Sequence, residues 1–142
     1  MGRLASLRRL DSTDRLLLLE AALLLGAARL AIRFVPFARI AGRLGQHMAE
    51  TPATQPPEAL ATSRRVRKAV ELAARNLPWE SVCLPQAITA KLMLRRRGIP
   101  STLYLGVLRE KEFLAHAWVR AGEVVVTGDR GRDGFTVVST FA

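Results

Sequence analysis

The spacing of apolar residues along the chain changes after Pro100. Before this position, apolar residues recur three and four positions apart, which is typical of amphipathic helices. This spacing predicts helices over residues 15–34, 37–48, 58–76 and 84–97. After it, apolar and polar residues alternate, which predicts strands over residues 102–108, 113–120, 124–127 and 135–141. Short turns make such strands antiparallel neighbours, so we expect an α+β fold with helices first and an antiparallel sheet after them.

Acidic residues, prolines and glycines mark the ends of these helices. The stretch at residues 11–14, Asp-Ser-Thr-Asp, stands directly before the first helix, where side-chain oxygens can cap the free backbone N–H groups and acids suit the positive end of the helix dipole. Pro85 falls in the first turn of the helix that follows Cys83, where the N–H that proline lacks would be unpaired anyway. At the other end of that helix, Gly98 is suited to a left-handed cap and Pro100 prevents continuation. Cys83 is therefore predicted to lie at a helix N-terminus.

The first predicted helix is apolar almost all round between Leu16 and Leu25. A transmembrane span needs about 20 apolar residues, and the charges of Glu20, Arg29 and Arg33 leave this apolar run too short. The acidic residues before and within the helix also disfavour a signal peptide. We therefore expect the helix to be buried against the rest of the domain or against a partner protein. Peripheral attachment to a membrane is the alternative.

A proline-rich segment divides the chain. Residues 51–57 contain three prolines and no apolar periodicity, and we interpret them as a linker. An N-terminal helical layer then covers residues 1–50 and a catalytic unit covers residues 58–142, together forming one structural domain. His47 has no other candidate catalytic group near it in the sequence, and we interpret it as a structural or surface histidine.

The chain is strongly basic, with a formal net charge of +10. Its basic residues are spread along the sequence, with short runs only at 64–68 and 95–97 and no aromatic residues within them. A base-stacking surface for nucleic acid is therefore poorly supported, and the run at 64–68 is interpreted as a solvated helix face. A single cysteine excludes an intramolecular disulfide and fits a reducing compartment. There is no cluster of His and Cys residues, so we expect no metal and no cofactor.

Three residues form a candidate catalytic set. Counting outward from the turn at residues 121–123 places His116 opposite Thr127 or Gly128, with Asp129 within side-chain reach. Each residue alone has a structural explanation: a buried thiol, a core histidine and a turn-capping aspartate. Together, a cysteine at a helix N-terminus, a histidine and an aspartate are the groups that thiol acyl transfer requires.

The expected roles follow from the chemistry of each group. The helix dipole at Cys83 favours the thiolate, which is the nucleophilic form of cysteine. His116 would remove the thiol proton and later protonate the leaving amine, while Asp129 would orient the imidazole. The oxyanion would be held by the Cys83 backbone N–H together with a side-chain donor from Trp79 or Gln86.

The motifs around these residues carry a family resemblance. From about Ser63 to the C-terminus, the sequence resembles the peptidase component of lasso-peptide biosynthesis, the B protein, which belongs to the transglutaminase-like, papain-like fold group. The resemblance rests on CLPQA at 83–87, LMLRRRGIP at 92–100, LGV at 105–107 and AHAWV at 115–119. In that family the cysteine, histidine and aspartate are catalytic, and they correspond to Cys83, His116 and Asp129.

The resemblance also implies a substrate and partners. Members of the family remove the leader from a ribosomally made precursor peptide in the cytoplasm, and a lasso cyclase then closes the ring. Residues 1–60 are predicted to be helical and do not show the alternating strands of a fused leader-recognition domain. The chain therefore resembles the stand-alone form, which relies on a separate leader-binding protein. A transglutaminase-like acyltransferase and a non-catalytic leader-binding adaptor remain as alternative functions.

Overall fold

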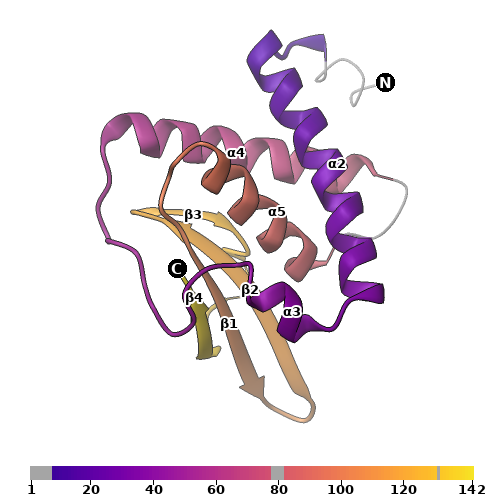
Figure 1. Cartoon of the computed structure of the whole chain (residues 1–142), viewed down its shortest axis with the longest axis vertical. Coiled ribbons are helices and arrows are strands. Elements are labelled where there is room, and N and C mark those ends of the chain that lie inside the picture. Colours follow the sequence, from indigo (N-terminus) through magenta and orange to yellow (C-terminus); the bar gives the residue numbers. More distant parts are fainter. Residues whose placement is uncertain (1–7, 78–81, 131) are drawn as a thin grey trace.

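The computed structural model describes residues 8–77, 82–130 and 132–142. Helices precede strands, as the hydrophobic pattern predicts, and the α+β fold is confirmed (Figure 1). The helices are α2 (Ser12–Phe34), α3 (Phe37–Ala41), α4 (Pro57–Asn76) and α5 (Cys83–Arg96). The strands are β1 (Thr102–Arg109), β2 (Phe113–Ala121), β3 (Val124–Thr127) and β4 (Thr136–Phe141).

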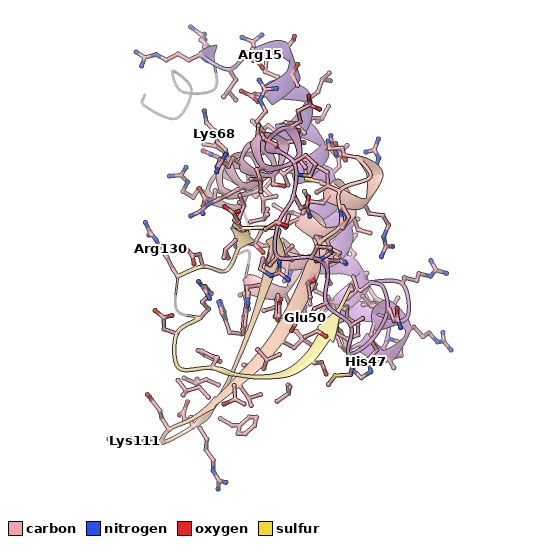
Figure 2. All side chains as sticks on the ribbon, turned by 90° about the vertical axis from the view of Figure 1, so that its left-hand side faces the viewer. Arg15, His47, Glu50, Lys68, Lys111 and Arg130 are labelled. Carbon is pink, nitrogen blue, oxygen red and sulfur yellow. The ribbon has the colours of Figure 1, made fainter. Side chains whose placement is uncertain are left out.

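The strands form one antiparallel sheet in the order β3-β2-β1-β4. Short turns join β1 to β2 and β2 to β3, whereas the segment after Thr127 carries the chain to the opposite edge, where β4 pairs with β1. The hairpin of β1 and β2 extends beyond the rest of the molecule, with Lys111 at its tip (Figure 2). In this strand order β1 and β2 are the central strands, and each has a neighbouring strand on both sides.

Helix α5 lies between the sheet and the other long helices. It contacts β1, β2 and β3 as well as α2 and α4. It is consequently buried nearly all round, whereas the sequence pattern predicts a single buried face. Its C-terminus closes as predicted: Gly98 has a φ of 68°, and the N–H of Ile99 bonds to the carbonyl of Leu94 at 3.0 Å. Burial on nearly all sides and the closed C-terminus together fix the position of α5, whose first residue is Cys83.

Helix α2 packs on the domain through only one of its faces. Leu17, Ala21, Leu25 and Ala28 are buried in the common apolar core. The opposite face is apolar but exposed, and it consists of Leu16, Leu19, Leu23, Leu30 and Phe34, the α2 stripe. Within the described residues, no helix combines the length and the apolar character needed to cross a bilayer. The predicted burial of this helix against the domain thus holds for one of its faces.

The predicted second helix is much shorter than expected. A helix over residues 37–48 was predicted, but α3 ends at Ala41. Gly45 has a φ of 125°, and a Cβ at this position would lie 1.9 Å from the carbonyl oxygen of Ala142. The chain here forms a bridge between His47 and Phe141 instead of a helix. Contact with the end of β4 therefore outweighs the local helical pattern.

The segment expected to be a linker is irregular but firmly docked. The backbone N–H of Thr51 bonds to Thr102 Oγ1 at 2.9 Å, and Arg120 Nη2 bonds to the Thr51 carbonyl at 2.9 Å. Gln55 Nε2 donates to the Pro100 carbonyl at 2.5 Å. These bonds attach the segment before α4 to the strands.

Candidate active site

Cys83 is the first residue of α5, as the sequence predicts. The N-cap residue, Val82, is in an extended conformation and supplies no side-chain cap to the helix. Among the described residues, the first-turn N–H groups of Cys83 and Leu84 are available to an anion near the thiol, whereas Pro85 has no N–H and that of Gln86 bonds to the Val82 carbonyl at 3.5 Å. The Cys83 side chain is partly exposed and lines a cavity of about 470 Å³.

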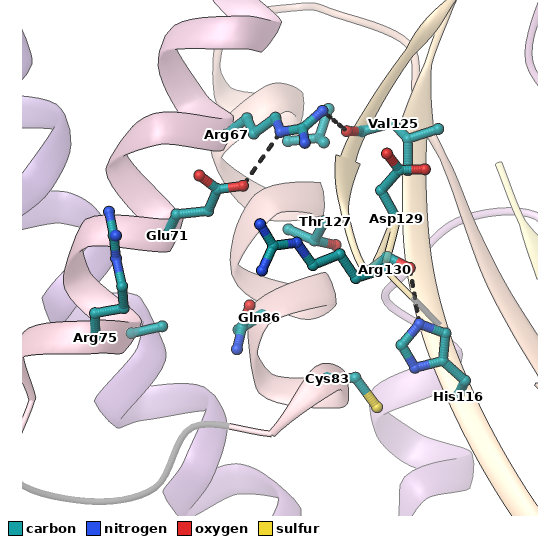
Figure 3. A pocket seen from close by; sticks show the side chains of 13 residues that line it. Arg67, Glu71, Arg75, Cys83, Gln86, His116, Val125, Thr127, Asp129 and Arg130 are labelled. Atoms are coloured by element: carbon teal, nitrogen blue, oxygen red, sulfur yellow. Dashed lines mark hydrogen bonds and ion pairs between the residues drawn. The ribbon is translucent and has the colours of Figure 1, made fainter. Parts of the chain in front are cut away.

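His116 lies on β2 and lines the same cavity. Its Nε2 is 2.8 Å from the carbonyl oxygen of Gly128. Because a carbonyl oxygen can only accept, Nε2 carries the hydrogen, and in the neutral ring Nδ1 is the unprotonated nitrogen. Figure 3 shows the Cys83 sulfur directed towards His116, on the side of that second nitrogen. The arrangement is suited to proton transfer from the thiol to His116.

Aromatic rings hold the His116 imidazole in place. Its centroid lies 5.7 Å from that of Trp118 and 5.4 Å from that of Phe135. Trp118 is itself stacked on Tyr104, with centroids 5.5 Å apart and planes 8° apart. Sequence analysis missed this support, although strand alternation places residues 116 and 118 on one face of β2. The packing restricts the ring orientations open to His116.

Gly106 is required by this aromatic cluster. It pairs with His116 across the two central strands, and a Cβ there would lie 2.8 Å from the Trp118 ring and 3.1 Å from Phe135 Cβ. We expect Gly106→Ala to lower the free energy of unfolding by about 1 to 3 kcal/mol and to reduce activity, because both displaced residues contact His116. Urea denaturation measures the first effect. Gly42→Ala, where the nearest atom would be 3.6 Å away, is the control; equal stability of both variants would refute this role.

Asp129 lines the cavity, but its carboxylate is engaged elsewhere. Its Oδ1 accepts a hydrogen bond from Arg132 Nε at 2.9 Å, and the His116 bond goes to Gly128 instead. The predicted strand register was also wrong. Val119, not His116, pairs with Thr127. Ala121 pairs with Val124 directly at the turn, and a register shift between Val119 and Arg120 displaces the pairing by one further residue. The backbone carbonyl next to Asp129 thus occupies the orienting position predicted for the aspartate side chain.

The cavity brings together the predicted residues and several that were not predicted. Gln86 lines it, while Trp79 lies outside the described residues. The charged side chains that sequence analysis did not connect with the site are Arg67, Glu71, Arg75 and Arg130. Arg67 was interpreted as part of a solvated face, but its Nη1 bonds to the Val125 carbonyl at 3.1 Å and its Nε to Glu71 at 3.2 Å. Among the described residues, no group of three His, Cys, Asp or Glu side chains is arranged to hold a metal ion.

Comparison with known proteins agrees with the observed fold. The family model described as the transglutaminase-like superfamily matches residues 22–140, and the chain belongs to this superfamily. The matched range includes most of α2 as well as the sheet, and so extends further towards the N-terminus than the motif resemblance. No curated protein and no solved structure matches the chain. The superfamily includes cysteine peptidases and acyltransferases.

Proposed function

We propose that the protein is a cysteine peptidase that removes the leader peptide from a ribosomally synthesised precursor of the lasso type. The observation that carries the proposal is the joint placement of Cys83 and His116 in one cavity, with His116 Nε2 bonded to the Gly128 carbonyl. Membership of the transglutaminase-like superfamily supports thiol chemistry. The choice of a lasso-type precursor rests on the CLPQA and AHAWV motifs.

In the proposed mechanism, His116 Nδ1 accepts the thiol proton and the Cys83 sulfur attacks the carbonyl carbon at the end of the leader. The resulting oxyanion lies at the N-terminus of α5, where the Cys83 N–H and the Gln86 side chain are candidate donors. When the C–N bond breaks, His116 protonates the leaving amine and the leader remains as a thioester on Cys83. Water then hydrolyses this thioester and releases the leader with a free carboxylate.

We propose Asp129 as the third catalytic residue, acting through its charge. The Gly128 carbonyl already selects the tautomer of His116. Asp129 lines the same cavity, so its negative charge stabilises the imidazolium that forms when His116 accepts the proton. Its bond to Arg132 holds the carboxylate in position.

The α2 stripe is proposed to bind the separate leader-binding protein in the cytoplasm. We expect replacement of Leu16, Leu19 and Leu23 by Ser to slow cleavage of the full-length precursor about tenfold or more when that protein is present. Alkylation of Cys83 should be unchanged, because these side chains are exposed. Phe113→Ser is the control, since Phe113 is equally exposed but lies at the hairpin tip. Loss of membrane association with normal cleavage would instead favour a peripheral anchor, and a defect only in ring closure would favour contact with the lasso cyclase.

The proposed function is tested by incubating the protein with precursor and leader-binding protein and following the products by mass spectrometry. Wild-type protein should release the intact leader with a free carboxylate, and Cys83→Ala should release none. Unchanged release by Cys83→Ala would refute the peptidase assignment. An amide-linked product would identify an acyltransferase, and binding of the leader without cleavage by either protein would identify an adaptor.

A further inference from the structure

We infer that the active-site cavity contains a subsite for a carboxylate of the peptide substrate, formed by Arg75, Arg130 and the hydroxyl of Thr127. The inference deepens the proposed function, and rests on it for the identity of the substrate as a peptide. The preference for an anion near Cys83 can be measured without any peptidase activity.

The charges of the cavity do not balance locally. Its two carboxylates already have partners: Glu71 accepts from Arg67 at 3.2 Å, and Asp129 accepts from Arg132 at 2.9 Å. Arg75 and Arg130 also line the cavity, and neither forms an ion pair or hydrogen bond with any described residue. In Figure 3, Arg130 reaches across the cavity from one side and Arg75 projects from α4 on the other. Two guanidinium groups are thus available to a negatively charged ligand.

The Thr127 hydroxyl is a second, independent indication of a ligand in the cavity. Thr127 is only 6% exposed and lines the cavity at the end of β3. Its Oγ1 is buried and has no hydrogen-bond partner among the described residues. Buried hydroxyls are normally paired because an unpaired one loses its bonds to water without replacement. A substrate carboxylate in the cavity would accept the hydrogen of this hydroxyl.

The N-terminus of α5 adds to the same positive field, since Val82 gives it no side-chain cap. All of these groups line the cavity that contains Cys83. The recognised carboxylate therefore belongs to a residue close to the cleaved bond. It is either the side chain of an acidic residue or the C-terminal carboxylate of a short peptide.

The first test compares alkylation of Cys83 by iodoacetate and by iodoacetamide, which differ mainly in charge. Cys83 is the only thiol, so intact mass reports its reaction directly. The rate ratio of iodoacetate to iodoacetamide should be about three- to tenfold higher for the folded protein than for the protein in denaturant. The double variant Arg75→Gln/Arg130→Gln should lose this preference, Thr127→Val should reduce it, and Arg109→Gln at the distant end of β1 should retain it. Equal ratios in folded and denatured protein, or a preference that survives the double variant, would overturn the subsite.

The second test uses matched peptide substrates that carry Glu or Gln beside the cleaved bond and a free or amidated C-terminus. A lower KM for the Glu peptide assigns the subsite to an acidic side chain, and a lower KM only for the free C-terminus assigns it to the terminal carboxylate. In either case Arg75→Gln/Arg130→Gln should remove the difference. Equal KM values for all four peptides would overturn the assignment to substrate recognition. Failure to cleave any peptide, with the alkylation preference intact, would refute the peptidase function and leave the anion subsite standing.

Discussion

Replacing His116 by alanine is expected to slow leader release about ten-thousandfold, the scale typical of losing the general base of a nucleophile pair. In the proposed mechanism His116 removes the Cys83 proton, because its Nε2 is bonded to the Gly128 carbonyl and its Nδ1 is left as the base. Single-turnover cleavage of the precursor measures the effect. His47→Ala is the matched control: the other histidine bonds to Ser139 at 3.3 Å and stacks on Phe141, and it should retain full activity.

Asp129→Asn should have a much smaller effect in the same assay, about tenfold. Where an aspartate selects the histidine tautomer, its replacement by asparagine lowers the catalytic rate about ten-thousandfold, because the amide can stabilise the wrong tautomer. Here a backbone carbonyl makes that selection, and substitution of a side chain does not remove it. A ten-thousandfold loss in Asp129→Asn would show that Asp129 bonds directly to His116 during catalysis, contrary to this account.

The stability of the protein should rise between pH 8 and pH 10 because of Lys91. Its side chain is buried at 4% exposure and donates to the carbonyl of Ser101. Burial lowers the pKa of Lys91 to about 8, with a further contribution from the charge of Arg95. Above this pH the unfolded chain, with a lysine pKa of about 10.4, binds more protons than the folded chain, so the free energy of unfolding increases with pH. The gain from this one residue should be about 2 kcal/mol between pH 8 and pH 10.

Urea denaturation gives the change in the free energy of unfolding from pH 7 to pH 10 for each protein. The contribution of Lys91 is the change in wild-type protein minus the change in Lys91→Met. Other groups that titrate in this range contribute equally to both proteins and cancel. Lys111→Met, at the exposed hairpin tip, should follow the wild-type pH dependence. Parallel curves for wild type and Lys91→Met would contradict the low pKa of Lys91.

Most of the fold could be predicted because local signals agreed with it. Asp11 accepts from the N–H of Asp14 at 2.7 Å, as an N-cap should, and Gly98 takes the left-handed conformation. Prediction failed where distant contacts decided the structure. The tether of residues 46–48 to β4 shortens α3, and the burial of Lys91 depends on the packing of α2, α4 and the sheet around α5.

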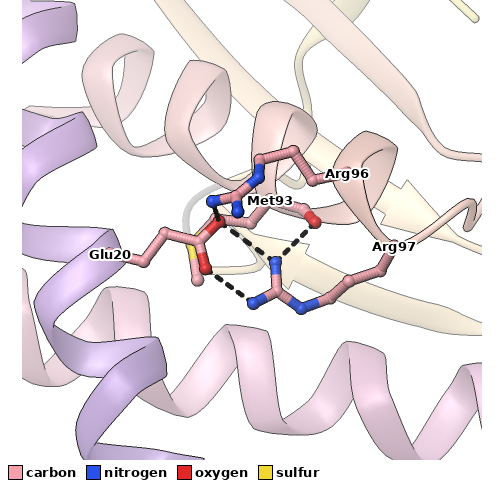
Figure 4. A network of polar contacts seen from close by, with 4 residues as sticks. All are labelled: Glu20, Met93, Arg96 and Arg97. Atoms are coloured by element: carbon pink, nitrogen blue, oxygen red, sulfur yellow. Dashed lines mark hydrogen bonds and ion pairs between the residues drawn. The ribbon is translucent and has the colours of Figure 1, made fainter.

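Glu20 is a residue whose structural role could not be predicted from the sequence. In the sequence it appears as an interruption of an apolar run. In the fold its carboxylate pairs with Arg97 at 2.6 Å and Arg96 at 2.6 Å, joining α2 to the end of α5 (Figure 4). The hydrogen bond from Arg97 lowers the pKa of Glu20. The partners lie 76 and 77 residues away, so no local pattern could indicate them.

Which leucines of α2 are exposed could also not be predicted from the sequence. From the sequence alone, Leu17, Leu18 and Leu24 are as suitable for contact with a partner as the leucines of the α2 stripe. Leu17 is buried, and the other two are half-buried against the core. When a helix is apolar all round, its sequence does not distinguish the buried face from the exposed face. Only the packing in the structure shows which face remains exposed.

Only part of the candidate site could be predicted from the sequence. Cys83 and His116 could be chosen as candidates because thiol chemistry requires these residue types, and the structure places them after a helix start and on a strand beside one cavity. The carbonyl of Gly128 carries no sequence signal, because every residue has a carbonyl. Its position near His116 depends on the register between β2 and β3, where the pairing skips Val126, and counting from the turn does not show this shift.

The central claim is that Cys83 becomes acylated by the leader, and intact-mass measurement of the acid-quenched protein tests it most directly. Mixing the protein with precursor and leader-binding protein, and quenching within the first turnover, should yield a species heavier by the leader acyl group. Hydroxylamine should remove this mass, as expected for a thioester, and Cys83→Ser should not form the hydroxylamine-sensitive adduct. Leader release that proceeds at the wild-type rate without any adduct, and that persists in Cys83→Ala, would contradict the account.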